Sequence, residues 1–156
     1  MLNSKTKPTD KYLKTLLSYY EDEIIGEAYF YELANYFSEK EKLILLARVE
    51  RKAAESIVSL LQKYNLIPRD ESILKPLGIV DAKLDCTYSW LGFMKYIVQR
   101  YPGYLEEFKA LEEMALKDDL GALKQLTEHE ILAINFAKKE ISGDPNSLDP
   151  LHNYLS

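Results

Sequence analysis

Four glutamates lie where the sequence otherwise places apolar residues. They are Glu27, Glu50, Glu107 and Glu130, and each is flanked three or four positions away by apolar or aromatic residues, as Glu27 is by Ile24. Residues at this spacing share one face of a helix, so each carboxylate is expected to point into the protein interior. Carboxylates are hard oxygen donors, and four of them would offset most of the charge of two iron or manganese ions. These glutamates are therefore candidate ligands of a metal site.

The same glutamates recur at a spacing that indicates two equivalent helical hairpins. Glu27 and Glu50 are 23 residues apart, and so are Glu107 and Glu130, although Glu106 competes with Glu107 for the inward position. A shift of 80 residues superimposes Leu43 on Leu123, Leu46 on Leu126, Glu50 on Glu130 and Ala53 on Ala133. We infer that each hairpin contributes a pair of inward carboxylates.

Four long segments with helical periodicity must position these side chains. They cover residues 10–37, 39–65, 87–116 and 119–141. Thr9 is the expected N-cap of the first segment, and Ser38 with Glu41 form a possible capping box for the second. Asn65 can end the second segment in the left-handed conformation.

The segments between and within these helices contain residues that disfavour helix. Residues 66–85 include Pro68, Pro76 and Gly78, and they are expected to form a long connection without regular structure. Pro102 and Gly103 predict a kink or a break in the third helix. Either Asp118 or Asp119 can cap the fourth helix, which is expected to stop at Gly143, and the apolar tail after it should form a short docked turn.

The run Gly26-Glu27-Ala28-Tyr29-Phe30, and Glu50 followed by an alanine-rich turn, resemble the ferritin-like superfamily of di-iron carboxylate proteins. The resemblance extends from about Asp10 to Ile141. It implies an all-α, antiparallel four-helix bundle with one long crossover between the second and third helices. It also implies a pair of iron or manganese ions, with Glu27, Glu50, Glu107 and Glu130 as ligands.

The sequence departs from that family at two ligand positions. The family has Glu-x-x-His on two helices, but here Ala53 follows Glu50 and Ala133 follows Glu130 at the histidine position. His129 is adjacent to Glu130 and about 100° away around the helix, so it is not expected to replace the missing ligand. A pair of metals, a single metal and no metal are all compatible with this pattern.

Two alternatives need no metal. The glutamates can reach solvent or pair with Arg48, Arg51 or Lys52, or they can form a buried network with shared protons and tyrosine hydroxyls. His129 is then a hydrogen-bonded residue of the bundle. Unpaired ionised carboxylates in a core cost several kcal/mol each, which disfavours burying all four without partners.

Composition restricts the class of protein. The 156 residues suit a single domain of residues 1–156, with 47% hydrophobic and 29% charged residues. There is no apolar run long enough to cross a bilayer and no secretory leader, so we expect a cytoplasmic protein. The single cysteine, Cys86, excludes an internal disulfide and any CxxC motif. A net charge of −5 without a basic stripe argues against binding to nucleic acid.

Two functions follow from these observations. The first is a metal-binding or oxidoreductase-like protein with a degenerate di-metal carboxylate site. The second is a non-enzymatic helical bundle that has lost its metal and acts as a dimerising or partner-binding module. Twelve tyrosines against five phenylalanines exceed what one small core needs, so a homodimer with an aromatic and aliphatic interface is expected.

Overall fold

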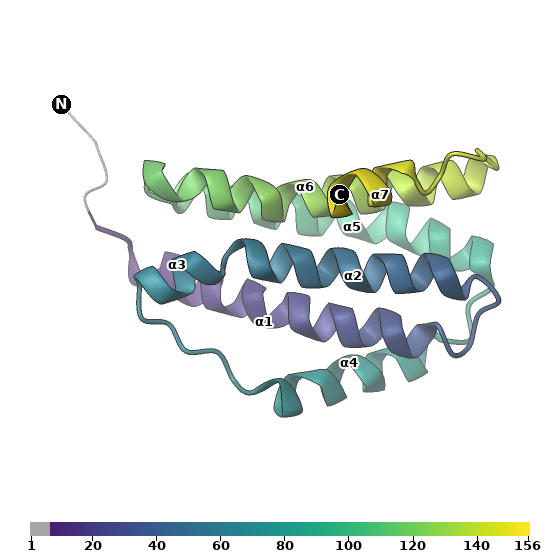
Figure 1. Cartoon of the computed structure of the whole chain (residues 1–156), viewed down its shortest axis with the longest axis horizontal. Coiled ribbons are helices and arrows are strands. Elements are labelled where there is room, and N and C mark those ends of the chain that lie inside the picture. The colour runs from purple at the N-terminus through teal and green to yellow at the C-terminus, as the bar shows by residue number, and fades with distance from the viewer. Residues whose placement is uncertain (1–6) are drawn as a thin grey trace.

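The computed structural model describes residues 7–156, and the described chain is helical throughout, with no strand. Four long helices lie side by side, and shorter helices pack around them (Figure 1). The long helices are α1 (Asp10–Leu33), α2 (Lys40–Ser56), α5 (Trp90–Met114) and α6 (Leu120–Ser142). The shorter ones are α3 (Val58–Lys63), α4 (Glu71–Asp85) and α7 (Asp149–Leu155), with one 3-10 turn, η1 (Lys117–Asp119). The predicted all-α class is confirmed.

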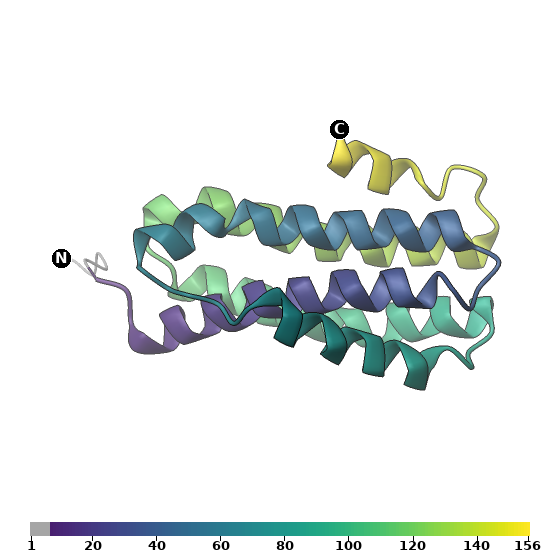
Figure 2. The same cartoon turned by 60° about the horizontal axis from the view of Figure 1, so that its bottom comes forward.

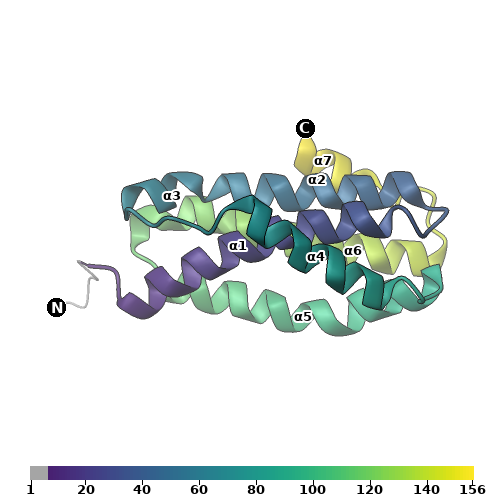
Figure 3. The same ribbon diagram turned by 90° about the horizontal axis from the view of Figure 1, so that it is seen from below.

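The long helices form two hairpins. α1 packs along α2, and α5 packs along α6, while α2 and α6 join the two hairpins in the interior. α1 and α5 touch each other much less, although both border the same side of the molecule (Figure 3). This weak contact leaves space between α1 and α5, and the candidate site opens into that space.

Two apolar clusters fill the interior toward opposite ends of the long helices. One includes Leu43, Phe93 and Phe136, and the other includes Leu16 and Leu126. The buried polar residues Glu23, His129 and Glu130 fall between these clusters along the helices. The interior therefore has a polar middle bounded by apolar packing on either side.

The long connection between α2 and α5 contains helix α4, so the expectation of an irregular segment was wrong. Asp70 caps α4 by accepting a hydrogen bond from the Ser72 amide at 2.8 Å. Pro76 lies inside the helix but faces solvent, where a missing amide donor is tolerated best. Gly78 faces α1, and a Cβ there would overlap the Ile25 carbonyl oxygen and the Tyr29 amide nitrogen. At this close contact, α4 crosses the outer side of α1 (Figures 2 and 3).

The ends of the first two helices differ in part from prediction. Thr9 caps α1 as expected, accepting from the Tyr12 amide at 3.1 Å, but α1 ends at Leu33 rather than at residue 37. The predicted capping box is absent from α2, because its N-cap is Glu39 and no side chain caps the helix. The predicted second helix is divided at Ile57, whose φ of −111° and ψ of 6° are not helical.

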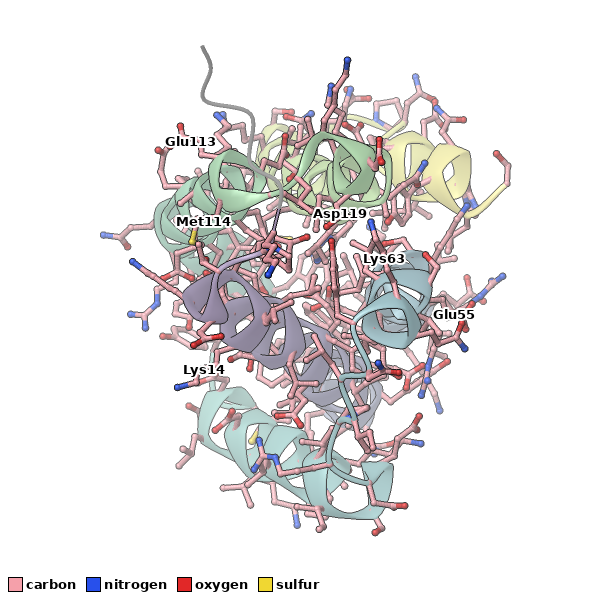
Figure 4. The ribbon with its side chains drawn as sticks, turned by 90° about the vertical axis from the view of Figure 1, so that its left-hand side faces the viewer. Lys14, Glu55, Lys63, Glu113, Met114 and Asp119 are labelled. Carbon is pink, nitrogen blue, oxygen red and sulfur yellow. The ribbon has the colours of Figure 1, made fainter. Side chains whose placement is uncertain are left out.

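The second half of the chain corrects two further expectations. α5 runs without a break through Pro102 and Gly103, both of which are exposed. Asp119 precedes α6, but its side chain makes no capping hydrogen bond. Instead the fully buried carboxylate accepts from the hydroxyls of Tyr12 and Tyr64 and from Lys63 Nζ, at 2.8, 2.6 and 2.7 Å. Figure 4 shows Lys63 and Asp119 at this end of the molecule.

The tail forms α7, in agreement with the expected docked turn. Gly143 ends α6 in the left-handed conformation, with φ of 72°, and the chain then returns along α2 and α6. Leu151 is fully buried in the apolar cluster that contains Leu43. Among the described helices, none combines the length and the apolar character that a membrane span requires.

Candidate metal centre

His129 lies at the centre of the polar middle of the protein. Its side chain is 1% exposed, and helix α6 presents it toward α1 and α2. Ring atom Nδ1 contacts the backbone carbonyl oxygen of Leu126, one turn earlier on the same helix. When Nδ1 donates a hydrogen bond to a backbone carbonyl, the orientation of the ring is fixed. Nε2, on the opposite edge of the ring, then points away from that carbonyl. Metal-binding histidines commonly have this arrangement.

Three carboxylates from three helices surround Nε2 of His129. The distances from Nε2 are 2.8 Å to Glu23 on α1, 2.9 Å to Glu50 on α2 and 3.3 Å to Glu130 on α6. Nε2 of His129 and Oε2 of Glu23 are both buried at ion-pair distance from each other, although their alignment is not that of a good hydrogen bond. One imidazole nitrogen thus faces three carboxylates, which is more acidic groups than a single proton can pair with.

The electrostatics of the cluster indicate an excess of negative charge. Burial raises the pKa of Glu130 to about 8; His129 opposes this shift, while Glu50 and Glu107 add to it. Burial, together with the charge of Glu50, also raises the pKa of Glu23. Burial by itself would lower the pKa of His129, but the carboxylates of Glu23 and Glu50 outweigh that effect and raise it well above its ordinary value. The site therefore favours a positive charge at Nε2, which a proton or a metal ion can supply.

Gly26 allows Glu50 to reach this cluster. A Cβ at Gly26 would overlap Oε1 of Glu50, so any larger residue here would force the Glu50 carboxylate to move away from its observed position against α1. Gly26 is one turn after Glu23 on the same helix. α1 therefore supplies one carboxylate and the space for a second.

The structure brings together two of the four glutamates predicted from the sequence. Glu50 and Glu130 both contact His129. Glu27 is buried, but its carboxylate binds Arg51 through two hydrogen bonds of 2.7 and 2.9 Å, and Arg51 also pairs with Glu71. Glu27 thus adopts the arginine pairing that the sequence offered as an alternative, and the predicted ligand set has to be revised.

Glu107 borders the site without joining the group around Nε2. Its side chain is exposed and lines a cavity that also reaches Glu23, Glu50 and Glu130. Glu106 is exposed and does not line this cavity. Of the two competing glutamates on α5, Glu107 is therefore the one that faces the site.

Sequence reasoning missed Glu23 and set His129 aside. Glu23 lies one turn before Glu27 on the same helical stripe, so periodicity alone does not separate them. The available signal was Gly26, because a glycine within a helix often marks a close approach. His129 was set aside because it is 100° from Glu130, yet both side chains reach one point, with Nε2 3.3 Å from the Glu130 carboxylate.

A cavity of about 520 Å³ leads to the cluster from between α1 and α5, with the end of α4 at its rim. The inner part of its wall includes the carboxylates of Glu23, Glu50 and Glu130, which are largely buried. The outer part includes the exposed side chains of Asp22 and Glu107. Three carboxylates of the cluster therefore border a cavity that opens between α1 and α5, while His129 lies behind them.

Comparison of the chain with protein-family models, curated proteins and solved structures finds no match. No family is therefore assigned. Function has to be inferred from the site, because a helical fold hosts many unrelated activities.

Proposed function

We propose that this protein is a metal-binding protein of ferritin-like architecture that holds a divalent cation at Glu23, Glu50 and His129, with the carboxylate of Glu130 beside them. Two helical hairpins joined by a long crossover support that architecture. The observation that carries the metal assignment is the convergence of carboxylates from three helices on the buried Nε2 of His129, with ligand atoms of Glu23, Glu50 and His129 within 4.8 Å of one another. A cation bound at this point would offset the surrounding negative charge.

The donors fit iron or manganese. Imidazole suits iron, and carboxylates suit manganese and other hard cations. Ligand atoms of Glu23, Glu50 and His129 lie within 4.8 Å of one another, which matches one shared ion. Because Glu27 is bound to Arg51, and Glu107 lies outside the group, we propose a single ion in place of the pair that the sequence suggested. When bound, such an ion would supply Lewis-acid or redox chemistry at the floor of the cavity.

The chain's own residues prepare the site for a cation. The backbone contact of Nδ1 leaves Nε2 facing the carboxylates. The raised pKa values of Glu23 and Glu130 mean that binding of a cation displaces protons, so we expect binding to strengthen as pH rises. The carboxylate-lined cavity attracts cations and disfavours anions.

The test is metal content and metal-dependent stability. Protein purified without an affinity metal or chelator should contain iron or manganese by elemental analysis. Adding Mn²⁺ to metal-free protein at about 100 times the dissociation constant should raise the free energy of unfolding by about 2.7 kcal/mol. Glu23→Gln and His129→Gln should each abolish this gain, and Glu27→Gln should preserve metal binding. No metal in the parent protein, together with no stabilisation by Mn²⁺ or anaerobic Fe²⁺, would show that the cluster is a structural network.

A second candidate function is a dimerising module, and the outer face of α4 favours it. Ile73, Leu77, Val80 and Leu84 follow one another at three- and four-residue intervals and are 55, 44, 58 and 72% exposed. Charges along α4 nearly balance, so two copies can meet on this face with little repulsion although the chain carries −5 overall. We propose a homodimer in which the α4 stripes of two copies pair. This proposal is compatible with a metal site, because the stripe lies on the side of α4 that faces away from α1.

A further inference from the structure

The cavity between α1 and α5 has aromatic walls as well as acidic ones. Its volume of about 520 Å³ lies within the range of small-molecule pockets. Five tyrosines contribute to its surface: Tyr19, Tyr29, Tyr96, Tyr101 and Tyr104. The faces of aromatic rings carry partial negative charge and attract cations. The metal proposal uses only the floor of this cavity and leaves its tyrosine-lined part without a role.

Every charged residue that lines the cavity, among the described residues, is acidic except Arg100. The acidic side chains form an inner level at Glu23, Glu50 and Glu130 and an outer level that includes Asp22 and Glu107. On the inner level, Glu23 is 5% exposed, and its carboxylate lies 2.8 Å from Nε2 of His129. The cavity is therefore lined by acidic side chains from its opening to its buried end.

The outer level does not resemble a metal site. Among the described residues, the acidic side chains close enough to share an ion are Glu23 and Glu50, together with His129. At the outer level, Asp22 on α1 and Glu107 on α5 line the cavity together with Tyr19. Two carboxylates that do not share an ion, with aromatic rings beside them, suit an organic cation that is larger than a metal ion.

We propose that this cavity binds a small linear organic amine, with an ammonium group held between tyrosine rings and the carboxylates of Asp22 and Glu107. Tyr101 and Tyr104, on successive turns of α5, have ring centroids 5.5 Å apart and provide an aromatic wall for the methylene chain. A second ammonium group of a diamine points toward the inner carboxylates when no metal is bound there. The proposal goes beyond metal binding and does not depend on it, because the outer level involves no proposed metal ligand.

The test uses chelator-treated protein and isothermal titration calorimetry with 1,4-diaminobutane and tetramethylammonium as probes. Both cations should bind, and the neutral isostere 1,4-butanediol should give no binding heat. Asp22→Asn and Glu107→Gln should each weaken diaminobutane binding by about tenfold, because each removes a charge partner of the ammonium group. Tyr104→Leu keeps the charge of the cavity and should weaken binding by about fivefold through loss of a cation–π contact.

The matched control is Asp118→Asn, which removes the same charge from an exposed aspartate outside the cavity. It should leave diaminobutane binding unchanged. Three results would overturn the proposal: 1,4-butanediol that binds as tightly as diaminobutane, an Asp118→Asn change that weakens diaminobutane binding as much as Asp22→Asn does, or failure of both cations to bind. Because the titration is done without metal, its failure is distinct from failure of the metal proposal, which is judged on elemental content and Mn²⁺-dependent stability.

Discussion

At the scale of single residues, two neighbouring turns of α1 carry glutamates with opposite roles. Glu23 shares the single nitrogen Nε2 of His129 with Glu50 and Glu130, whereas Glu27 has Arg51 as a bidentate partner. The two residues differ in their partners and hardly at all in their own burial, at 5 and 7% exposure. A buried carboxylate with a bidentate arginine is structural, and one that shares a single imidazole with two other carboxylates is available to a cation.

A third buried carboxylate, Asp119, provides a test of a satisfied network. Burial by itself would raise the pKa of Asp119, but hydrogen bonds from Lys63, Tyr64 and Tyr12 outweigh it and hold the pKa below its ordinary value. A lowered pKa in the folded state means that the network stabilises the protein above about pH 4 and that this contribution is lost as pH falls through the folded-state pKa.

We therefore expect Asp119→Asn to lower the free energy of unfolding at pH 7 by about 1–3 kcal/mol. The difference between variant and parent should shrink as pH falls below about 4, because the parent then also loses the charge. Denaturant titrations at several pH values measure this directly. Asp118→Asn, at the exposed neighbouring position, is the control and should have little effect. A constant difference at all pH values would show that the charge of Asp119 is not what stabilises the network.

At the scale of elements, α4 shows how a segment rich in helix-disfavouring residues becomes a helix. Its contact with α1 supplies what local propensity lacks: Leu74, Gly78 and Ala82 form the buried face, and the glycine permits the closest approach. Pro76 causes little harm because it lies on the exposed side. The helix therefore depends on tertiary packing.

Two glycine substitutions separate close packing from helix propensity. Gly78→Ala should destabilise the protein by about 1–3 kcal/mol, because the new methyl group meets α1 backbone atoms that cannot move aside easily. Gly103→Ala, within α5 and with open space around it, should instead stabilise by about 0.5–1 kcal/mol. Thermal unfolding gives both values, and hydrogen exchange should show faster exchange confined to α4 in Gly78→Ala. Equal effects of the two changes would contradict the close contact of α4 with α1.

At the scale of the whole molecule, the exposed stripe of α4 and the opening of the cavity lie next to each other on the surface. α4 covers α1, and its last turn reaches the rim of the cavity through Leu84 and Asp85. Tyr29 of α1 fixes that turn by donating to Asp85 at 2.6 Å. Pairing of two copies through α4 would therefore place a second copy near the entrance to the cavity.

Sedimentation tests the proposed homodimer. The parent protein at tens of micromolar should sediment as a dimer, and Val80→Lys should sediment as a monomer, because a charge in the middle of the stripe cannot be buried without a partner. Ile141→Lys is the control, since it places the same charge on an exposed apolar residue of α6. It should leave the dimer intact. A parent protein that is monomeric at these concentrations, or a Val80→Lys variant that stays dimeric, would contradict pairing through α4.

The sequence by itself determined the features that depend on local periodicity and capping. The all-α class, the four long helices, the Thr9 cap, the left-handed Asn65 and the stop at Gly143 all follow from short-range physical chemistry. It also identified Glu50 and Glu130 as inward-facing, because helical phase gives the direction of a side chain relative to its own helix axis.

Only the tertiary structure decided which inward residues meet. Glu23 and Glu27 share a phase but are about 6 Å apart along α1, and the register of α2 against α1 places Glu50 beside the first and Arg51 beside the second. His129 reaches the same point because α6 is positioned so that two adjacent residues border one cluster. The existence of α4 likewise depended on the surface of α1. Contacts between helices depend on their relative positions, and periodicity within a single helix contains no information about those.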